Sequence, residues 1–291
     1  MRLIAVMPCR NSDWIIGLTA RAALQWCDGL VLLNHASTDK TEAICKEICH
    51  GNPLKAAYMN EPDPLWAEMA HRQRMLEVAR DLGATHIALV DDDEILTGNL
   101  LPTIRDHAAQ TPIRTIFTLP WHWLRGSIMK YHRSGPWGRS DVSTAFVDDP
   151  RWHWSAKDQR GYDHHHRHPF GHPWVPFKPI KRADGGLMHL QSVSDRRVRA
   201  KALMYMLIER LRWPESKTPA QLNAQYGLAV YDESPRSLAD LGDVPPEWWE
   251  CYRPLMKYLH VDAEPWQLAA ARAMIREHPG IEKGLDTFDV L

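Results

Sequence analysis

The stretch that decides the fold of this chain is His86-Ile87-Ala88-Leu89-Val90-Asp91-Asp92-Asp93-Glu94. Its apolar residues predict a short buried strand, and that strand runs directly into three aspartates and a glutamate. Open α/β sheets bind their ligands at the carboxyl ends of such strands. Adjacent carboxylates repel one another there, and a hard divalent cation that bridges to phosphate groups would stabilise them. The stretch therefore predicts a metal and diphosphate site at a strand end.

Strands and helices alternate on both sides of this stretch. Apolar runs predict strands, and apolar positions at helical spacing predict helices between them. The expected strands are residues 3–7, 30–33, 56–59, 86–90 and 113–119, and the expected helices are 11–26, 42–50 and 64–82. This alternation is typical of an α/β protein with a mostly parallel, doubly wound sheet flanked by helices.

The second half of the chain has a different composition. Residues 121–181 are rich in Pro, Gly, Trp and His and predict loops and short strands, and residues 185–190 predict one more strand. A strong helix is expected at 195–213, and shorter helices are expected at 218–226, 246–259 and 265–278. The last two begin near a proline, as helices often do.

The composition is that of an ordinary globular protein. The chain has 291 residues, of which 44% are hydrophobic and 24% charged, so it can bury a full core. No apolar stretch approaches the ~20 residues of a membrane span, and the N-terminus is too short for a signal-peptide core, so no integral membrane contact is expected. The five cysteines show no disulfide spacing, which predicts reduced thiols and a cytoplasmic location.

Charge is distributed unevenly along the chain. The formal net charge is −1, but residues 120–212 hold 17 Lys and Arg against 8 Asp and Glu, which gives a local charge of +9. The same segment contains nine of the 16 histidines and six of the 13 tryptophans. This pattern favours an anionic ligand or an anionic acceptor, although most of these residues are expected to be solvated surface or aromatic core.

Two motifs occur in order on successive strands. The predicted second strand is followed by Ser37-Thr38-Asp39-Lys40-Thr41, and a later strand ends in Asp91-Asp92-Asp93-Glu94. The pair resembles the motifs of family 2 glycosyltransferases with the GT-A fold. The resemblance covers residues 1–95 and implies a GT-A domain at 1–212, with a nucleotide-sugar half at 1–119 and an acceptor and metal half at 120–212. A helical C-terminal extension at 213–291 would follow.

The resemblance also implies a donor site. Enzymes of this family bind a nucleotide diphospho-sugar at the ends of the first two strands, which places Pro8, Arg10, Asn11 and Asp39 near the nucleotide. Asn34 stands where the family has a loop aspartate; it can still hydrogen-bond a base or ribose, but the change weakens the case for uridine.

The acidic motif is the expected metal site. Asp91 and Asp93 would hold Mn²⁺ or Mg²⁺ against the diphosphate, with Asp93 as the direct ligand and Asp91 toward the ribose or a metal-bound water. Asp92 adjoins them, and His189 is a further metal candidate. A lone histidine on an apolar strand is more often a core residue, but the acidic motif elsewhere makes the two interpretations of His189 about equal. Residues that could contact the diphosphate from a helix are Arg196, Arg197, Arg199 and Lys201.

An inverting transfer needs a carboxylate that deprotonates the acceptor hydroxyl. Asp163 is the first candidate, because it lies among histidines in Gly161-Tyr162-Asp163-His164-His165-His166-Arg167-His168, and Asp141 is the second. Asp148, Asp149 and Asp158 remain alternatives, and a retaining reaction stays open. The histidines at 164, 165, 166, 168 and 172 are interpreted as a loop at the mouth of the active site, because consecutive residues cannot all face one zinc ion.

The leading hypothesis is therefore a metal-dependent glycosyltransferase, with a UDP-sugar favoured. Its acceptor is a saccharide or, because the basic middle segment interleaves cations and tryptophans, a nucleic acid such as a modified DNA base. A nucleotidyltransferase acting on sugar phosphates is an alternative, which the absence of glycine in Pro8-Cys9-Arg10-Asn11-Ser12 disfavours. A non-catalytic module that binds nucleotide sugars or nucleic acid is another.

Overall fold

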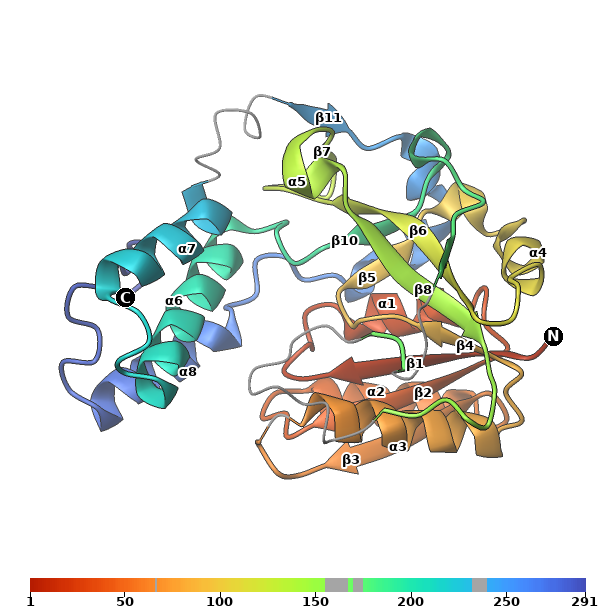
Figure 1. The fold of residues 1–291 in the computed structure, drawn as a ribbon, viewed down its shortest axis with the longest axis horizontal. Helices are drawn as coiled ribbons and strands as arrows, with labels where there is room; N and C mark the ends of the chain where they lie inside the picture. The colour runs from red at the N-terminus through yellow and green to blue at the C-terminus, as the bar shows by residue number, and fades with distance from the viewer. Residues whose placement is uncertain (66, 155–166, 170–174, 232–239) are drawn as a thin grey trace. The chain divides into compact units, whose positions relative to one another are not determined.

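The computed structural model describes residues 1–65, 67–154, 167–169, 175–231 and 240–291 (Figure 1). The chain divides into two compact units. The first comprises residues 1–121, 140–188 and 245–260, and the second comprises residues 122–139, 189–244 and 261–291. Residues 245–260 pack with the first unit, and the predicted domains at 1–212 and 213–291 stay predictions.

The first unit is built on a mixed sheet that is parallel on one side. Within the described residues its strand order is β3-β2-β1-β4-β8-β6-β10-β5, and β9 pairs with β6. The four parallel strands are β1 (Leu3–Cys9), β2 (Gly29–His35), β3 (Ala56–Glu61) and β4 (His86–Leu89). The others are β5 (Glu94–Leu96), β6 (Thr115–Trp123), β8 (Asp141–Val147), β9 (Val175–Phe177) and β10 (Leu187–His189), and the last residues of β6 and β10 belong to the second unit.

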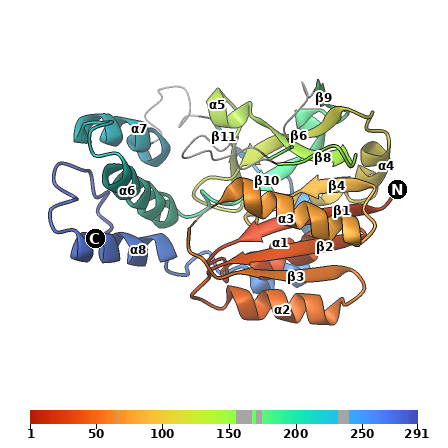
Figure 2. The same cartoon turned by 60° about the horizontal axis from the view of Figure 1, so that its bottom comes forward.

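Helices cover both faces of the parallel strands, as Figure 2 shows. Every residue of β1 and β2 is buried, as expected for parallel strands covered on both sides. Leu3, Ala5 and Met7 pack with helices α1 (Ile16–Ala23) and α2 (Thr41–Gly51), whereas Ile4 and Val6 pack with helix α3 (Glu68–Asp81). The alternation of side chains along β1 therefore sorts the core into two layers.

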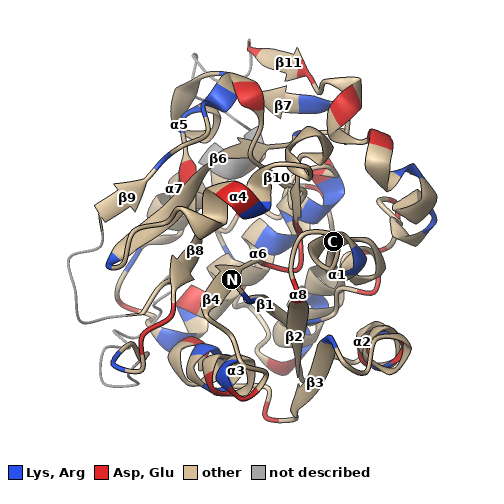
Figure 3. Cartoon of the chain, turned by 90° about the vertical axis from the view of Figure 1, so that its right-hand side faces the viewer, with Lys and Arg blue, Asp and Glu red and all other residues tan. Residues whose placement is uncertain are grey.

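The antiparallel part of the sheet begins next to β4. Strand β8 pairs antiparallel with β4 and with β6, and η1 (Gly98–Leu100), α4 (Ile104–Ala109) and η3 (Arg182–Asp184) complete this region. Helix α3 carries both Arg and Asp or Glu side chains, as the blue and red segments of Figure 3 show.

Residues 246–259 differ from the predicted α-helix. They form the 3-10 helices η4 (Pro246–Trp248) and η5 (Glu250–Tyr258), because Pro254 lacks the backbone N–H that an α-helix would need there. They also belong to the first unit, since the Tyr258 ring lies against Gly17 of α1 and His260 N donates to the Trp14 carbonyl oxygen at 2.8 Å. A Cβ on Gly17 would lie 3.0 Å from Tyr258 Cβ, so glycine permits this close approach.

The second unit packs three helices together. They are α6 (Asp195–Arg212), α7 (Pro219–Tyr231) and α8 (Trp266–Glu277), and their shared core includes Leu203, Leu207 and Phe288 (Figure 1). The unit also contains the antiparallel pair β7 (Lys130–His132) and β11 (Leu241–Asp243) and the short helix α5 (Gly135–Gly138).

The predicted α/β class with a mostly parallel sheet flanked by helices is confirmed. The predicted helix at 11–26 is shorter, because Asn11 adopts a left-handed backbone (φ 49°) and the regular helix begins at Ile16. Among the described residues, no helix has the length and apolarity required to cross a bilayer.

Candidate functional site

The strand order indicates where a ligand site is expected in the first unit. The chain moves outward from β1 through β2 to β3 and then returns to place β4 on the other side of β1. All four strands are parallel, so their carboxyl ends share one edge of the sheet. A reversal of strand order at such an edge is where open α/β sheets bind ligands. The loops after β1 and β4 therefore flank the expected site, and the loop after β2 is their neighbour.

The loops after β1 and β2 are held together by side chains. Asn11 Oδ1 accepts a hydrogen bond from Thr38 N at 2.7 Å, and Asn11 N donates to Ser37 Oγ at 2.9 Å. Ser12 N donates to Thr41 Oγ1 at 2.6 Å. Asparagine tolerates the left-handed backbone found at Asn11 better than most residues, so the sequence suits this turn.

Asp39 reinforces the same junction. Its Oδ1 accepts from Thr41 N at 2.8 Å at the beginning of α2, and its Oδ2 accepts from Asp13 N at 3.2 Å. Burial and the nearby Asp39 raise the pKa of Asp13. Both oxygens of Asp39 thus position the loops, which is a structural role beside its predicted place near the nucleotide.

The acidic turn after β4 is tied to the loop after β1 and to helix α1. Ser12 Oγ donates a short hydrogen bond to Asp92 Oδ2, and Thr19 Oγ1 of α1 donates to the Asp92 carbonyl oxygen at 2.8 Å. The structure therefore brings together four predicted donor-site residues: Asn11, Asp39, Asp91 and Asp92.

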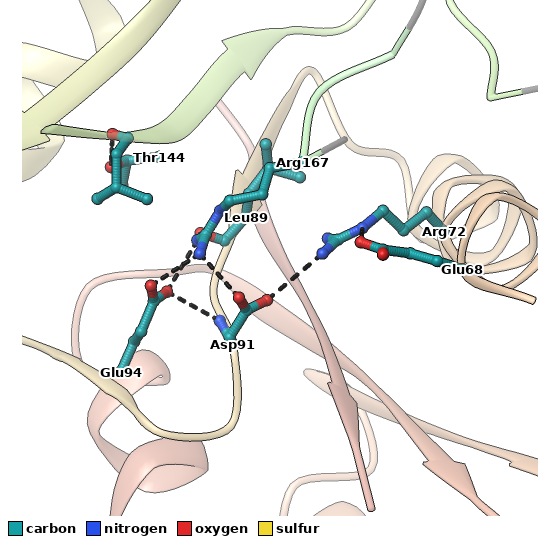
Figure 4. A network of polar contacts seen from close by, with 8 residues as sticks. Glu68, Arg72, Leu89, Asp91, Glu94, Thr144 and Arg167 are labelled. Carbon is teal, nitrogen blue, oxygen red and sulfur yellow. Dashed lines mark hydrogen bonds and ion pairs between the residues drawn. The ribbon is translucent and has the colours of Figure 1, made fainter. Parts of the chain in front are cut away.

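A positive side chain lies directly on the acidic turn. Arg167 Nη1 donates to Asp91 Oδ2 at 2.9 Å, and its two terminal nitrogens donate to the Glu94 carboxylate at 2.7 and 2.8 Å (Figure 4). Arg167 Nη2 also donates to the Leu89 carbonyl oxygen at 2.7 Å. Glu94 accepts a further bond from Asp91 N at 3.0 Å. The sequence predicts a metal ion as the positive partner of these carboxylates. In the structure, the guanidinium group of Arg167 partly neutralises them.

This pairing is buried. The side chain of Glu94 is fully buried, and that of Arg167 is 7% exposed. Burial by itself lowers the pKa of Arg167, but attraction to Asp91 and Glu94 outweighs it and raises the pKa above its ordinary value. Arg167 therefore remains a cation, as a buried carboxylate partner requires.

A second arginine approaches Asp91 from helix α3. Arg72 Nη2 lies 3.5 Å from Asp91 Oδ1, and Arg72 Nε donates to Glu68 Oε1 at 2.8 Å, as Figure 4 shows. The side chains of Arg72 and Glu68 are 3% and 5% exposed. Among the described ion pairs, Arg72 and Arg167 thus hold the carboxylates of Glu68, Asp91 and Glu94 together.

The donor set fits a hard divalent cation. Asp93 is half-buried on the turn between Asp91 and Glu94. Among the described residues, no three His, Cys, Asp or Glu side chains form a group that could hold a metal ion. Mg²⁺ is often bound by one or two carboxylates together with substrate phosphates, so a site of this kind needs no complete protein cage.

The ends of β1 and β2 carry further predicted residues. Asn34 is 1% exposed, and its Nδ2 donates to Asn60 Oδ1 on β3 at 2.8 Å. Arg10 Nη1 donates to the Pro64 carbonyl oxygen at 3.0 Å, and burial lowers the pKa of Arg10. Pro8 is a buried residue of β1 opposite Leu33. These three residues keep their predicted place at the strand ends, although the structure uses Asn34 and Arg10 for internal contacts.

Two buried histidines were missed beside this edge. The rings of His35 and His71 lie 4.9 Å apart, between the end of β2 and helix α3. Burial, with a smaller contribution from His35, lowers the pKa of His71 to about 4. Burial and the positive charge of Arg10 lower the pKa of His35.

The candidate general bases have different positions. Both oxygens of Asp141 are engaged, by Lys178 at 2.7 Å and Arg182 at 2.8 Å. Asp163 and Asp158 lie outside the described residues, as do four of the histidines around them. Asp148 and Asp149 follow β8 at the amino end of β4, where Asp148 N donates to the Thr85 carbonyl oxygen. They are therefore at the sheet edge opposite the acidic turn, which removes them as alternatives.

Five predicted ligands belong to the second unit: His189, Arg196, Arg197, Arg199 and Lys201. His189 is 5% exposed, and its ring lies edge-on to Trp123 with ring centroids 4.2 Å apart. Arg199 Nη1 donates to the Phe288 carbonyl oxygen at 3.2 Å, and Lys201 Nζ lies 5.6 Å from the Tyr205 ring centroid. Their roles toward a metal or diphosphate remain predictions.

Sequence reasoning missed the partners of the acidic turn. Arg167 lies in the same histidine-rich segment as Asp163. No local sequence pattern connects Arg167 to residues 91–94. Glu68 and Arg72 are four residues apart on one helix, a spacing that indicates a pair but gives no reason to place it beside Asp91.

Comparisons with models of protein families and with curated proteins find no match. Among solved structures the chain is similar to TarS of S. aureus, with 13% identity, a TM-score of 0.43, and coverage of 97% of this chain but only 55% of that chain. Against TarS 1-349 the identity is 12%, the TM-score 0.41, and the coverage 97% and 90%. A mannosyltransferase from Pyrobaculum calidifontis, solved with GDP-Man and Mn²⁺, is 14% identical at a TM-score of 0.37, with coverage of 95% and 74%.

Proposed function

We propose that this protein is a metal-dependent glycosyltransferase of the GT-A type, similar to family 2, that uses a nucleotide diphospho-sugar. The supporting observation is the carboxylate turn at residues 91–94, which is hydrogen-bonded to the loop after β1 and to helix α1 where the strand order reverses. This edge combines a cluster of carboxylates for a cation with backbone turns that can receive a nucleotide. A UDP-sugar remains the favoured donor.

The donor would lie across the three loops. Arg10, Asn11, Asn34 and Asp39 lie at the ends of β1 and β2, where the amide and guanidinium groups can hydrogen-bond a base or ribose. Asp93, assisted by Asp91, would hold Mn²⁺ or Mg²⁺. When bound, that ion would neutralise the charge that develops on the leaving nucleoside diphosphate. Arg167 and Arg72 hold Asp91 in place beside Asp93, which is the proposed first ligand.

The transfer itself requires a base for the acceptor hydroxyl. Asp163 and Asp141 are the proposed candidates in an inverting reaction, and each would take the hydroxyl proton as the oxygen attacks the sugar carbon. Asp141 could serve only if a ligand displaces Lys178 or Arg182 from its oxygens. The acceptor is a saccharide or a nucleic-acid hydroxyl, and residues 120–212 are proposed as the acceptor half.

Donor binding tests the proposal directly. Calorimetry with UDP-, GDP-, CDP- and dTDP-sugars, with Mn²⁺ and with chelator, should find one donor whose binding requires the metal. Asp93→Asn should abolish metal-dependent binding, whereas Asp106→Asn, which changes an exposed carboxylate on α4, should preserve it. Absence of binding to every donor in the presence of Mn²⁺ would refute the proposal. Binding that Asp93→Asn leaves unchanged would refute the assigned metal ligand.

A further inference from the structure

The second unit contains a small cavity with an aromatic wall. Its volume is about 120 Å³, and the polar residues around it are Arg125, His132, Gln191 and Ser192. Trp123 and Trp137 are half-buried and form its aromatic side. Their ring centroids are 4.5 Å apart, and their planes are tilted by 49°.

The backbone fixes both tryptophans. Residues after β6 run beside the segment at 189–192, since Leu124 N donates to the His189 carbonyl oxygen at 3.0 Å and Gly126 N donates to the Ser192 carbonyl oxygen at 2.8 Å. Trp137 lies on helix α5, which closes when Gly138 N donates to the Ser134 carbonyl oxygen at 3.0 Å. A Cβ on Gly138 would lie 2.4 Å from the carbonyl carbon of Arg133, so only glycine permits this turn.

The polar side of the cavity is also held in place. Arg125 Nη2 donates to the Val230 carbonyl oxygen at 2.8 Å and lies 3.3 Å from Asp195 Oδ1. The Arg125 side chain is 12% exposed, so packing within the second unit holds it in position. With the amide of Gln191 and the hydroxyl of Ser192, the cavity presents donors and acceptors opposite its aromatic wall.

This chemistry selects one class of ligand. A sugar ring has an apolar C–H face that can lie on an indole and hydroxyl edges that pair with amide, hydroxyl and guanidinium groups. A volume of about 120 Å³ has room for about four waters and is well below the ~300–1,000 Å³ of sites for larger ligands, which excludes a nucleotide. The 49° tilt between the indoles does not suit a flat base inserted between them, and Arg125 disfavours a cationic ligand.

We infer that this cavity is a saccharide subsite that receives one sugar ring of the acceptor. The inference rests on the proposed glycosyltransferase function and deepens it, because it selects a saccharide over a nucleic acid as acceptor. The indole of Trp137 stacks on the sugar ring, and the side chains of Gln191 and Ser192 form hydrogen bonds with the sugar hydroxyl groups.

The test uses the full chain and simple glycosides. Saturation-transfer NMR with methyl glycosides of glucose, galactose, mannose and N-acetylglucosamine should show transfer to the ring C–H protons of at least one of them. The open-chain polyol sorbitol should show none, because it lacks a ring face. Trp137→Ala should weaken binding about tenfold, as loss of one aromatic partner predicts, and Trp137→Phe should retain most of it. The matched control is Trp213→Ala, which removes a 39% exposed tryptophan of the same unit outside the cavity.

A second measurement does not depend on variants that fold poorly. In the wild-type protein labelled with ¹⁵N at the indoles, the bound glycoside should shift the N–H signals of Trp123 and Trp137 and leave that of Trp213 unmoved. Glycosides that bind nowhere, or that shift only other indoles, overturn the subsite. Donor calorimetry separates the failure of the subsite from the failure of the transferase function. Donor binding without glycoside binding refutes the subsite alone. Glycoside binding at Trp137 without donor binding supports a saccharide site and refutes the transferase.

Discussion

Replacing Glu94 with Gln should disrupt the buried charge network on the acidic turn. The substitution keeps the side-chain shape but turns two acceptor oxygens into one oxygen and one amide donor, which would face the donating nitrogens of Arg167. Arg167 would remain buried with Asp91 as its carboxylate partner in the network. The expected result is a clear loss of stability in the first unit.

The magnitude follows from burial. Removing one partner of a buried ion pair costs about 3–5 kcal/mol, and we expect about 3 kcal/mol here because Asp91 still faces the guanidinium. For a unit of this size, that corresponds to a fall in melting temperature of about 6–12 °C. Glu42→Gln is the matched control: it breaks an exposed pair with Lys46 at 2.6 Å and should change stability far less.

A double-mutant cycle tests the pairing itself. Urea unfolding followed by circular dichroism would compare Glu94→Gln, Arg167→Met and the double variant. Because each single change strands the other partner, the double variant should lose at least about 1 kcal/mol less than the two single losses together. Additive losses within about 0.5 kcal/mol, or a loss below about 1 kcal/mol for Glu94→Gln, would refute the reasoning.

Further predictions concern protonation, packing and thiols. Burial lowers the pKa of His71 to about 4, so as the pH falls from about 6.5 the unfolded state binds a proton before the folded state does. The free energy of unfolding should therefore decline between pH 6.5 and 4, and it should decline less steeply in His71→Gln. Equal slopes for the two proteins in pH-dependent urea unfolding would contradict this. Gly29→Ala should lower the free energy of unfolding by about 1–3 kcal/mol, because a Cβ there would lie 2.7 Å from a backbone oxygen. A Cβ on Gly51 would have nothing within 4 Å, so Gly51→Ala should change the free energy of unfolding by less than about 1 kcal/mol in the same assay. Iodoacetamide should modify exposed Cys251 before Cys27, whose pKa burial raises, and mass spectrometry showing the reverse order would be inconsistent with the packing.

The sequence was sufficient to predict the parallel half of the fold. The strands at residues 3–9, 29–35 and 86–89 are short apolar runs bounded by polar residues, a pattern set by burial on both faces. The same local rule failed at residues 246–259, where apolar spacing suggested an α-helix. There Pro254 and long-range packing on α1 decide the structure, and neither effect follows from periodicity.

The site was predictable where its residues follow strands. Asn11, Asp39, Asp91 and Asp92 meet because parallel strands end at one edge, which is a consequence of topology. Arg167 could not be predicted in the same way, because 73 positions of sequence separate it from Glu94 and no periodic pattern spans that interval. His71 reaches His35 through the packing of α3 on the sheet, which apolar spacing along α3 does not reveal.

The discontinuity of the first unit has a consequence during synthesis. Residues 245–260 contribute η5, whose Tyr258 covers Gly17 on α1, so this face of α1 has no native cover until that segment leaves the ribosome. At about 5–20 residues per second, the interval between residues 188 and 260 takes about 4–14 s. During that time the nascent chain would expose an apolar surface, and a chaperone that engages emerging chains would find it there.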